Sequence, residues 1–177
     1  MLLWPLVGEG LAPPAKRDKR AGQDPPLPIN RGVDLAVSEA YILEESCMAV
    51  VLFGDRILAT RELIYGKEAV SLPKGHIEAG ESHADTAIRE CFEETDIVLK
   101  ETDVVGEVEP YTVQFTDHHL RPVSKVIYPV VFRIDRCGEP RPKETRMLEA
   151  RFLDVKEFLV ACTYDNVKQI VRQAIEL

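Results

Sequence analysis

The 177-residue sequence has none of the features that mark a membrane-spanning or a disulfide-stabilised protein. No apolar run approaches the roughly 20 residues that a membrane-spanning helix needs, which excludes an integral membrane protein. The four cysteines (Cys47, Cys91, Cys137 and Cys162) are widely separated and form no C-x-x-C pair. This spacing argues against a zinc site and a disulfide framework and is typical of a reducing compartment. We therefore expect a cytoplasmic protein with no membrane partner.

Residues 1–32 lack the hydrophobic periodicity of a folded segment. Six of the twelve prolines fall within residues 1–31, and proline interrupts both helices and sheet ladders. The apolar stretch 1–7 has no basic leader, is broken by Pro5 and precedes no small-residue cleavage site, so we expect no secretion signal. We predict a flexible, proline-rich N-terminal arm over 1–32 and one folded domain over 33–177.

The sequence has fewer basic than acidic residues. The 22 lysines and arginines against 30 aspartates and glutamates give a formal net charge of −8. This balance disfavours duplex nucleic acid held by phosphate neutralisation alone. An anionic small molecule is compatible with it, provided that a metal ion or a local basic cluster supplies the attraction.

The pattern of apolar residues predicts an α/β protein. Strand-like runs occur at 47–53, 56–63, 70–72, 102–111, 125–134 and 150–153, and helical spacing occurs at 82–95, 154–161 and 165–176. Because strands precede, separate and follow the helices, we expect a mixed sheet covered by helices on both faces.

The most informative segment is the helix expected after Ser82. Ser82 is a good N-cap, and Asp85 three residues later approximates a capping box. Glu90, Glu93 and Glu94 lie at i, i+3 and i+4, so they share one face and repel one another. A hard divalent cation with oxygen ligands would offset this repulsion. The alternative is a solvated acidic face, which is common on helices.

The residues around this helix resemble the box of the Nudix hydrolase family, G-x5-E-x7-R-E-U-x-E-E-x-G-U, where U is a bulky apolar residue. Seven positions match at the required spacing: Gly75, Glu81, Arg89, Glu90, Glu93, Glu94 and Ile97. Two positions depart from the pattern. Cys91 replaces an apolar residue, a modest change because buried cysteine behaves as a small hydrophobe. Asp96 replaces a glycine, and aspartate tolerates a positive φ better than most residues, so we expect an intact site at a small cost in stability.

The resemblance implies a fold and a reaction. The expected fold is an α/β/α sandwich with a mixed sheet, in which the box forms a loop–helix–loop. The expected reaction is attack of water on a phosphoanhydride of a nucleoside polyphosphate, with Mg²⁺ or Mn²⁺ neutralising charge on the phosphoryl oxygens. By resemblance, Glu90 and Glu94 are the main metal ligands, Glu93 is a ligand or the general base, and the Lys74 carbonyl is a further ligand.

The resemblance also gives roles to the remaining box residues. Arg89 orients the carboxylates, Glu81 supports the loop, and Gly75 lets the backbone pass close to the metal. Many relatives add a glutamate from a later loop as base or ligand. Both Glu144 and Glu149 remain candidates for that position in this chain.

The stretch from Ser71 to Glu81 resembles the corresponding part of the bis(5′-nucleosyl)-tetraphosphatases within the family, which act on diadenosine tetraphosphate and stack an adenine on aromatic side chains. Tyr128 or Tyr111 would supply the stacking surface here. The alternative for Tyr128 is that it belongs to the core. Lys74 and His76 flank the box glycine and would contact the outer phosphates.

Three functions therefore remain open at this point. The first is a nucleotide pyrophosphohydrolase that converts diadenosine tetraphosphate to ATP and AMP. The second is a pyrophosphohydrolase for diphosphoinositol polyphosphates or for the 5′ end of RNA. The third is a non-catalytic module that senses a nucleotide. Each implies a small-molecule or end-group phosphoanhydride as partner, in a monomer or a homodimer.

Overall fold

A computed structural model describes residues 41–177 except 65, 118 and 137. Its strands are β1 (Ile42–Phe53), β2 (Arg56–Ile64), β3 (Lys67–Ser71), β4 (Lys74–His76), β5 (Val104–Glu107), β6 (Tyr111–Thr116), β7 (Pro122–Arg133) and β8 (Met147–Asp154). Its helices are α1 (His83–Thr95), α2 (Val155–Ala161) and α3 (Asp165–Ala174), with a 3-10 turn, η1, at Glu101–Asp103. The predicted arm over 1–32 and Cys137 lie outside the described residues.

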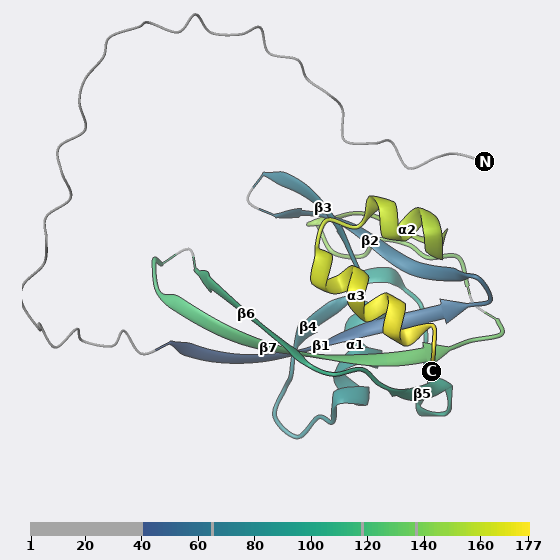
Figure 1. The fold of residues 1–177 in the computed structure, drawn as a ribbon, viewed down its shortest axis with the longest axis horizontal. Helices are drawn as coiled ribbons and strands as arrows, with labels where there is room; N and C mark the ends of the chain where they lie inside the picture. Colours follow the sequence, from purple (N-terminus) through teal and green to yellow (C-terminus); the bar gives the residue numbers. More distant parts are fainter. Residues whose placement is uncertain (1–40, 65, 118, 137) are drawn as a thin grey trace, which may run out of the picture. The chain divides into compact units, whose positions relative to one another are not determined.

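The sheet is mixed, as the sequence predicts. Its main path runs β3-β2-β1-β7-β5, while β4 pairs with β1, β6 with β7 and β8 with β2. β1 and β7 are parallel and paired over nearly their whole length, and the other pairings are antiparallel. β1 and β7 therefore form the centre of the molecule, from which the remaining strands extend (Figure 1).

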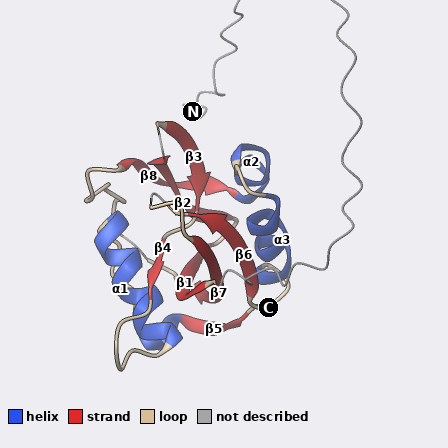
Figure 2. Cartoon of the chain, turned by 90° about the vertical axis from the view of Figure 1, so that its left-hand side faces the viewer, coloured by secondary structure: helices blue, strands red, loops and turns tan. Residues whose placement is uncertain are grey.

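The layers form an α/β/α sandwich. α1 lies on one face of the sheet, and α2 and α3 lie on the other (Figure 2). Seven consecutive positions of β1, from Ser46 to Leu52, are almost completely buried. Such a run is expected for a central strand that is covered on both faces. In the part of the chain that the structure describes, no helix is both long and apolar enough to cross a membrane.

α1 begins and ends as its sequence predicts. Ser82 is the N-cap, and its side chain and that of Asp85 form the reciprocal bonds of a capping box. At the other end Asp96 adopts a left-handed conformation, with φ 63°, and its N–H donates to the carbonyl of Phe92. The aspartate that replaces the box glycine therefore occupies the conformation in which glycine is favoured.

The long strand predicted over 102–111 is wrong. The chain instead forms η1, then β5, and after a break at 108–110 it forms β6. Both short strands pair with the same edge of β7, and the register shifts between Val104 and Gly106. Pro110 has no N–H to donate to a ladder, which explains why the strand is interrupted before Tyr111.

β4 is a strand that the apolar pattern does not reveal. Pro73 ends the preceding run, but its carbonyl accepts from the N–H of Ala49, which keeps the chain against β1. The three residues that follow pair with Ser46, Cys47 and Met48 of β1. This pairing fixes the loop before α1 to the centre of the sheet, so the glycine of the box has a defined place.

We predict that Asp96→Gly raises the free energy of unfolding by up to about 1 kcal/mol, because glycine carries no Cβ penalty at positive φ. Urea denaturation of the two proteins measures the difference. Asp135→Gly is the control, since Asp135 is an exposed aspartate without a positive φ and should lose stability or keep it. A loss for Asp96→Gly would mean that the Lys143–Asp96 ion pair, at 3.3 Å, outweighs the backbone term.

Candidate active site

Arg89 gathers the first group of box residues. Its Nε and Nη2 atoms donate to the two carboxylate oxygens of Glu81 at 2.7 and 2.9 Å. Nη1 donates to Glu90 at 2.6 Å and to Glu93 at 3.2 Å, and Nη2 also reaches the carbonyl of His76 at 2.8 Å. The bidentate pair holds the pKa of Glu81 at about 2, below its ordinary value of 4.5. Arg89 therefore links the helix to the loop that precedes it.

The close approach of the Glu90 carboxylate explains why position 75 is a glycine. A Cβ added to Gly75 would collide with the carboxylate of Glu90, including both of its oxygens. The Glu90 side chain is almost fully buried, and this burial raises its pKa, against the opposing effect of Arg89. The absence of a side chain at position 75 is thus what allows a helix carboxylate to lie directly on the β4 backbone.

Glu94 is the most deeply buried carboxylate of the box. Its side chain has no exposed surface, and the backbone N–H of Lys74 donates to its Oε2 atom at 3.3 Å. Burial raises the pKa of Glu94 to about 8, although Lys74 and Arg146 act to lower it. Lys74 and Arg146 therefore do not fully offset the effect of burial, and a further positive charge at this carboxylate would favour its ionised form at neutral pH.

Two residues that the sequence reasoning missed complete this group. Glu62 of β2 is also fully buried, and it accepts from the Nζ atom of Lys74 at 2.6 Å and from Arg146 at 3.0 Å. Arg146 also donates to Glu94 at 2.7 Å and to Glu144 at 2.7 Å. The sequence gives no alternation that marks Glu62, because Ile57 to Thr60 are buried on both faces of β2. Nothing local marks Arg146.

The loop between β7 and β8 brings Arg146 to the helix. The N–H groups of Arg141 and Lys143 donate to the last carbonyls of α1, those of Thr95 and Glu94. The ammonium group of Lys143 also lies 3.5 Å from the centre of the Phe92 ring. These contacts attach the loop to the end of α1, next to Glu94.

The structure separates the two later glutamates. Glu144 shares Arg146 with Glu94, so it belongs to the buried group. Glu149 instead pairs with Arg61 at 3.0 Å and with Arg151 at 3.3 Å on β8. Because Arg61 and Glu62 are consecutive on β2, their side chains point to opposite faces. Glu149 is therefore directed away from Glu62, and of the two candidates only Glu144 lies with the box.

The predicted substrate-binding residues divide between the two faces of the sheet. On β4, Lys74 pairs with Met48 of β1 and His76 pairs with Ser46. Ser46 in turn pairs with Ile127 of β7, and Ile127 pairs with Tyr111 of β6. Residues paired in this way have their side chains on the same face of the sheet. These three predicted residues therefore share the face that α3 covers. Tyr128 points to the other face, where its ring stacks on His83 at 4.0 Å and its hydroxyl donates to Glu45 at 2.9 Å. Tyr128 also packs partly buried against the core of that face.

Tyr111 is connected to the buried group through Tyr164. Burial raises the pKa of Tyr111, and the neighbouring Cys162 and Tyr164 raise it further. Burial also raises the pKa of Tyr164, which in turn lies close enough to Lys74 and Glu62 to feel their charges. The hydroxyl of Ser46, on the same face, is buried without a hydrogen-bond partner among the described residues.

The donor set suits a hard divalent cation, although the carboxylates are turned towards arginines. Within residues 41–177, apart from the three not described, no three such side chains already surround a common point as ligands. Glu90 and Glu94 nevertheless offer carboxylate oxygens on one face of α1, beside a β4 backbone that Gly75 leaves open. Glu90 and Glu94 would hold a cation at this place only if their oxygens were released by Arg89 and Arg146, which they now contact.

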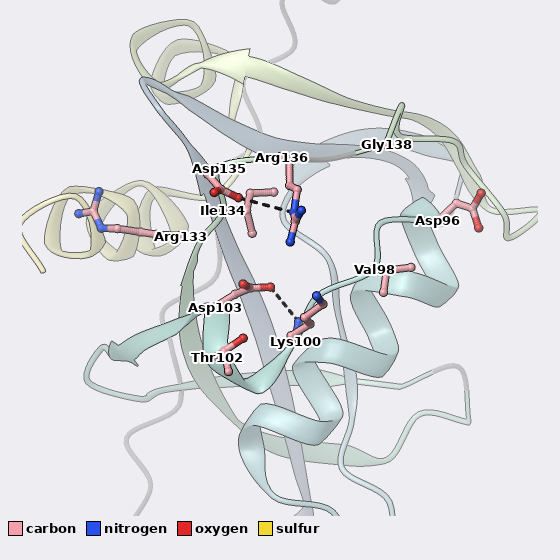
Figure 3. A pocket seen from close by; sticks show the side chains of 10 residues that line it. All are labelled: Asp96, Val98, Lys100, Thr102, Asp103, Arg133, Ile134, Asp135, Arg136 and Gly138. Carbon is pink, nitrogen blue, oxygen red and sulfur yellow. Dashed lines mark hydrogen bonds and ion pairs between the residues drawn. The ribbon is translucent and has the colours of Figure 1, made fainter.

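A separate hollow of 860 Å³ lies near the ends of α1 and β7 (Figure 3). Among the predicted site residues, none lines it. Its charged lining balances, with three basic residues against three acidic ones: Lys100, Arg133, Arg136, Asp96, Asp103 and Asp135. Arg133 points away towards the last helix, where it donates to the carbonyl of Ile175. We therefore do not place the active site in this hollow.

The low pKa of Glu81 predicts a pH-dependent contribution to stability. A carboxylate whose pKa is lowered stabilises the fold above its unfolded value, about 4.5, and loses this contribution as the pH falls towards 2. Glu81→Gln should therefore melt below the wild type at pH 7, with the gap narrowing between about pH 4.5 and 2. Glu78→Gln makes the same charge change in the same loop and should show a smaller gap. A gap independent of pH would contradict the role of the ionised Glu81–Arg89 pair.

Comparison with known proteins agrees with this geometry. The model of the NUDIX domain matches residues 45–174. A protein named MutT4 from Mycobacterium tuberculosis (strain CDC 1551 / Oshkosh) is 32% identical over 112 residues, which are 63% of this chain and 43% of MutT4. The chain thus spans less than half of the length of this relative.

Several solved structures share the fold. A NUDIX hydrolase from Nitrosomonas europaea matches with a TM-score of 0.58 and 19% identity, over 76% of this chain and 90% of its own. A bifunctional NMN adenylyltransferase/ADP ribose pyrophosphatase from Francisella tularensis, complexed with AMP and a manganese ion, matches with a TM-score of 0.57 and 20% identity, over 78% and 43%. An Ap4A hydrolase from C. elegans matches with a TM-score of 0.53 and 16% identity, over 75% and 96%. Because the family model matches residues 45–174, which are most of the chain, the chain belongs to the Nudix family of hydrolases.

Proposed function

We propose that this protein is a metal-dependent pyrophosphohydrolase of nucleoside polyphosphates, with diadenosine tetraphosphate, cleaved to ATP and AMP, as the best candidate substrate. The observation that carries the proposal is that the carboxylates of Glu90 and Glu94 both lie against the β4 backbone at Gly75 and Lys74, with Glu144 joined to Glu94 through Arg146. Bound Mg²⁺ or Mn²⁺ would neutralise the phosphoanhydride oxygens and lower the pKa of the attacking water.

The remaining roles in the proposed reaction are those of metal ligand, positioning residue and general base. Glu90 and Glu94 supply ligand oxygens, with the Lys74 carbonyl as a further one. Arg89 holds Glu81 and Glu90 in place through its bidentate and single hydrogen bonds. The general base is Glu93 or Glu144, because both are partly exposed and lie at the border of the buried group. Glu149 is the weaker candidate because Arg61 and Arg151 engage it elsewhere.

The nucleoside is proposed to lie on the face that α3 covers. Lys74, His76 and Tyr111 share this face, so a base stacked on Tyr111 has its phosphates directed to the edge of β4. Tyr128 is less suited, because it points to the other face and already stacks on His83. The names of the structural neighbours include both an Ap4A hydrolase and an ADP ribose pyrophosphatase, which makes ADP-ribose the natural competing substrate. A cytoplasmic location remains part of the proposal, supported by the free, buried thiols of Cys47, Cys91 and Cys162.

A substrate panel with Mg²⁺ and with Mn²⁺ tests the function. Diadenosine tetraphosphate, ADP-ribose, a nucleoside triphosphate, a diphosphoinositol polyphosphate and 5′-triphosphorylated RNA are compared by chromatography of their products. ATP and AMP from the dinucleotide support the proposal, while two molecules of ADP or preference for another compound contradict the substrate. Glu94→Gln should lower turnover by at least 10- to 100-fold, the loss seen for partners of metal ligands. Turnover within twofold of the wild type would exclude Glu94 as a ligand.

Gly75→Ala tests whether the metal site can be disrupted without a loss of stability of the fold. The new methyl group meets the end of a flexible side chain, so the Glu90 carboxylate is displaced while the backbone is retained. We expect Mn²⁺ affinity, measured by calorimetry, to fall on the order of 10- to 100-fold, with a melting temperature close to that of the wild type. Gly138→Ala is the matched control, because no atom lies within 4 Å of its added Cβ. Equal Mn²⁺ affinity in both variants would contradict the placement of Glu90.

A further inference from the structure

Arg146 occupies a position that the family box does not assign. Its guanidinium donates through three nitrogens to three carboxylates, with Nη2 on Glu94 at 2.7 Å, Nε on Glu144 at 2.7 Å and Nη1 on Glu62 at 3.0 Å. Two of these partners, Glu62 and Glu94, have no exposed surface, whereas the Arg146 side chain is 46% exposed. One half-exposed cation therefore neutralises part of a buried acidic group from its solvent side.

The backbone makes this placement a property of the fold. The carbonyl of Arg146 accepts from the N–H of Leu63 at 2.9 Å, which fixes the loop beside Glu62 on β2. The N–H of Met147 donates to the carbonyl of Glu144, so the two charged residues belong to one tight turn. On the helix side, the N–H of Lys143 donates to the carbonyl of Glu94. Arg146 is thus anchored between β2 and the end of α1.

The three carboxylates differ in what holds them when Arg146 moves. Glu62 keeps the Nζ atom of Lys74 at 2.6 Å, so its charge stays paired. Glu94 keeps the bond from the Lys74 N–H to Oε2, at 3.3 Å, and the more distant charge of the Lys74 ammonium, but it loses the direct contact of Arg146 with Oε1. A cation that binds Glu94 must therefore arrive as Arg146 leaves.

We propose that Arg146 is an exchangeable counter-ion of this site, which holds Glu94 and Glu144 until a divalent cation binds Glu94, and which then turns from both carboxylates to the phosphate oxygens of the substrate. Its bond to Glu62 keeps the guanidinium at the border of the site after the exchange. A planar guanidinium binds phosphate oxygens in the same bidentate manner as it binds carboxylates, so one side chain serves both partners. The inference rests on the proposed function for the identity of the incoming anion and for the place of the metal.

Calorimetry with Mn²⁺ on chelator-treated protein tests the exchange without any substrate. Arg146→Gln removes the competing charge, and we expect its Mn²⁺ affinity to be on the order of tenfold tighter than that of the wild type, comparable in size to other effects of partners of metal ligands. Arg146→Lys should fall between the two, because it keeps the charge but cannot contact three carboxylates. Arg141→Gln is the matched control, since Arg141 lies in the same loop with its side chain 69% exposed, and it should bind Mn²⁺ like the wild type.

Thermal stability and kinetics supply two further measurements. Without metal, Arg146→Gln should melt below the wild type, and saturating Mn²⁺ should raise its melting temperature by more than it raises that of the wild type. On a substrate that the protein cleaves, Arg146→Gln should raise KM more than it lowers kcat, because the arginine binds the phosphates and does not transfer a proton. If Arg146→Gln does not fold without metal, Arg146→Lys gives the same comparison of affinities.

The outcomes separate this inference from the proposed function. Mn²⁺ affinity that is unchanged or weaker in both Arg146 variants, together with normal hydrolysis by the wild type, overturns the counter-ion role alone. Tighter Mn²⁺ binding by the variants of a protein that cleaves nothing in the panel supports the exchange and overturns the proposed reaction. No Mn²⁺ binding by the wild type or by Arg146→Gln overturns both.

Discussion

The burial of Glu62 and Glu94 without exposed surface is the constraint on which this site depends. A carboxylate removed from water is costly unless cations or N–H donors contact it, and the fold supplies ion pairs from Lys74 and Arg146. These two cations come from separate elements, β4 and the loop before β8, so the group assembles only when the tertiary fold is complete. The ion pairs at this edge of the sheet therefore form only together with the packing of β1, β2 and α1.

The residues of β4 contact these carboxylates through both backbone and side-chain atoms. Pro73 ends one strand, Lys74 turns its N–H to Glu94 and its ammonium to Glu62, and Gly75 admits the carboxylate of Glu90. Two neighbouring residues, Lys74 and Gly75, thus contact three carboxylates that belong to α1 and β2. Because β4 pairs with β1 on one side only, the backbone groups of its other edge are not used by any other strand that the structure describes.

The local features of the site follow from the sequence, whereas its long-range partners do not. Ser82, Asp85 and Asp96 act through bonds to residues within four positions, and their roles as helix caps were predictable from residue type and spacing. Arg146 lies 52 positions from Glu94 and 84 from Glu62. No periodicity relates residues so far apart, and only the pairing of β2 with β8 and the attachment of the loop to α1 bring them together. The strand predicted over 102–111 failed for a similar reason, since β7 offers its edge to two short strands in separate registers.

The same distinction applies to the aromatic residues. Alternation along a strand tells which side chains share a face of that strand, but it does not tell which face lies next to Lys74. The register of β4 on β1, of β1 on β7 and of β6 on β7 supplies this information, and it separates Tyr111 from Tyr128 although both lie on strands next to each other. A substrate whose phosphates lie at the edge of β4 and whose base lies on the α3 face must pass around that edge. In the proposed binding mode, the edge at Lys74 and Gly75 would set how many phosphates separate the base from the carboxylates, and this number would decide which bond of a polyphosphate chain is presented to water.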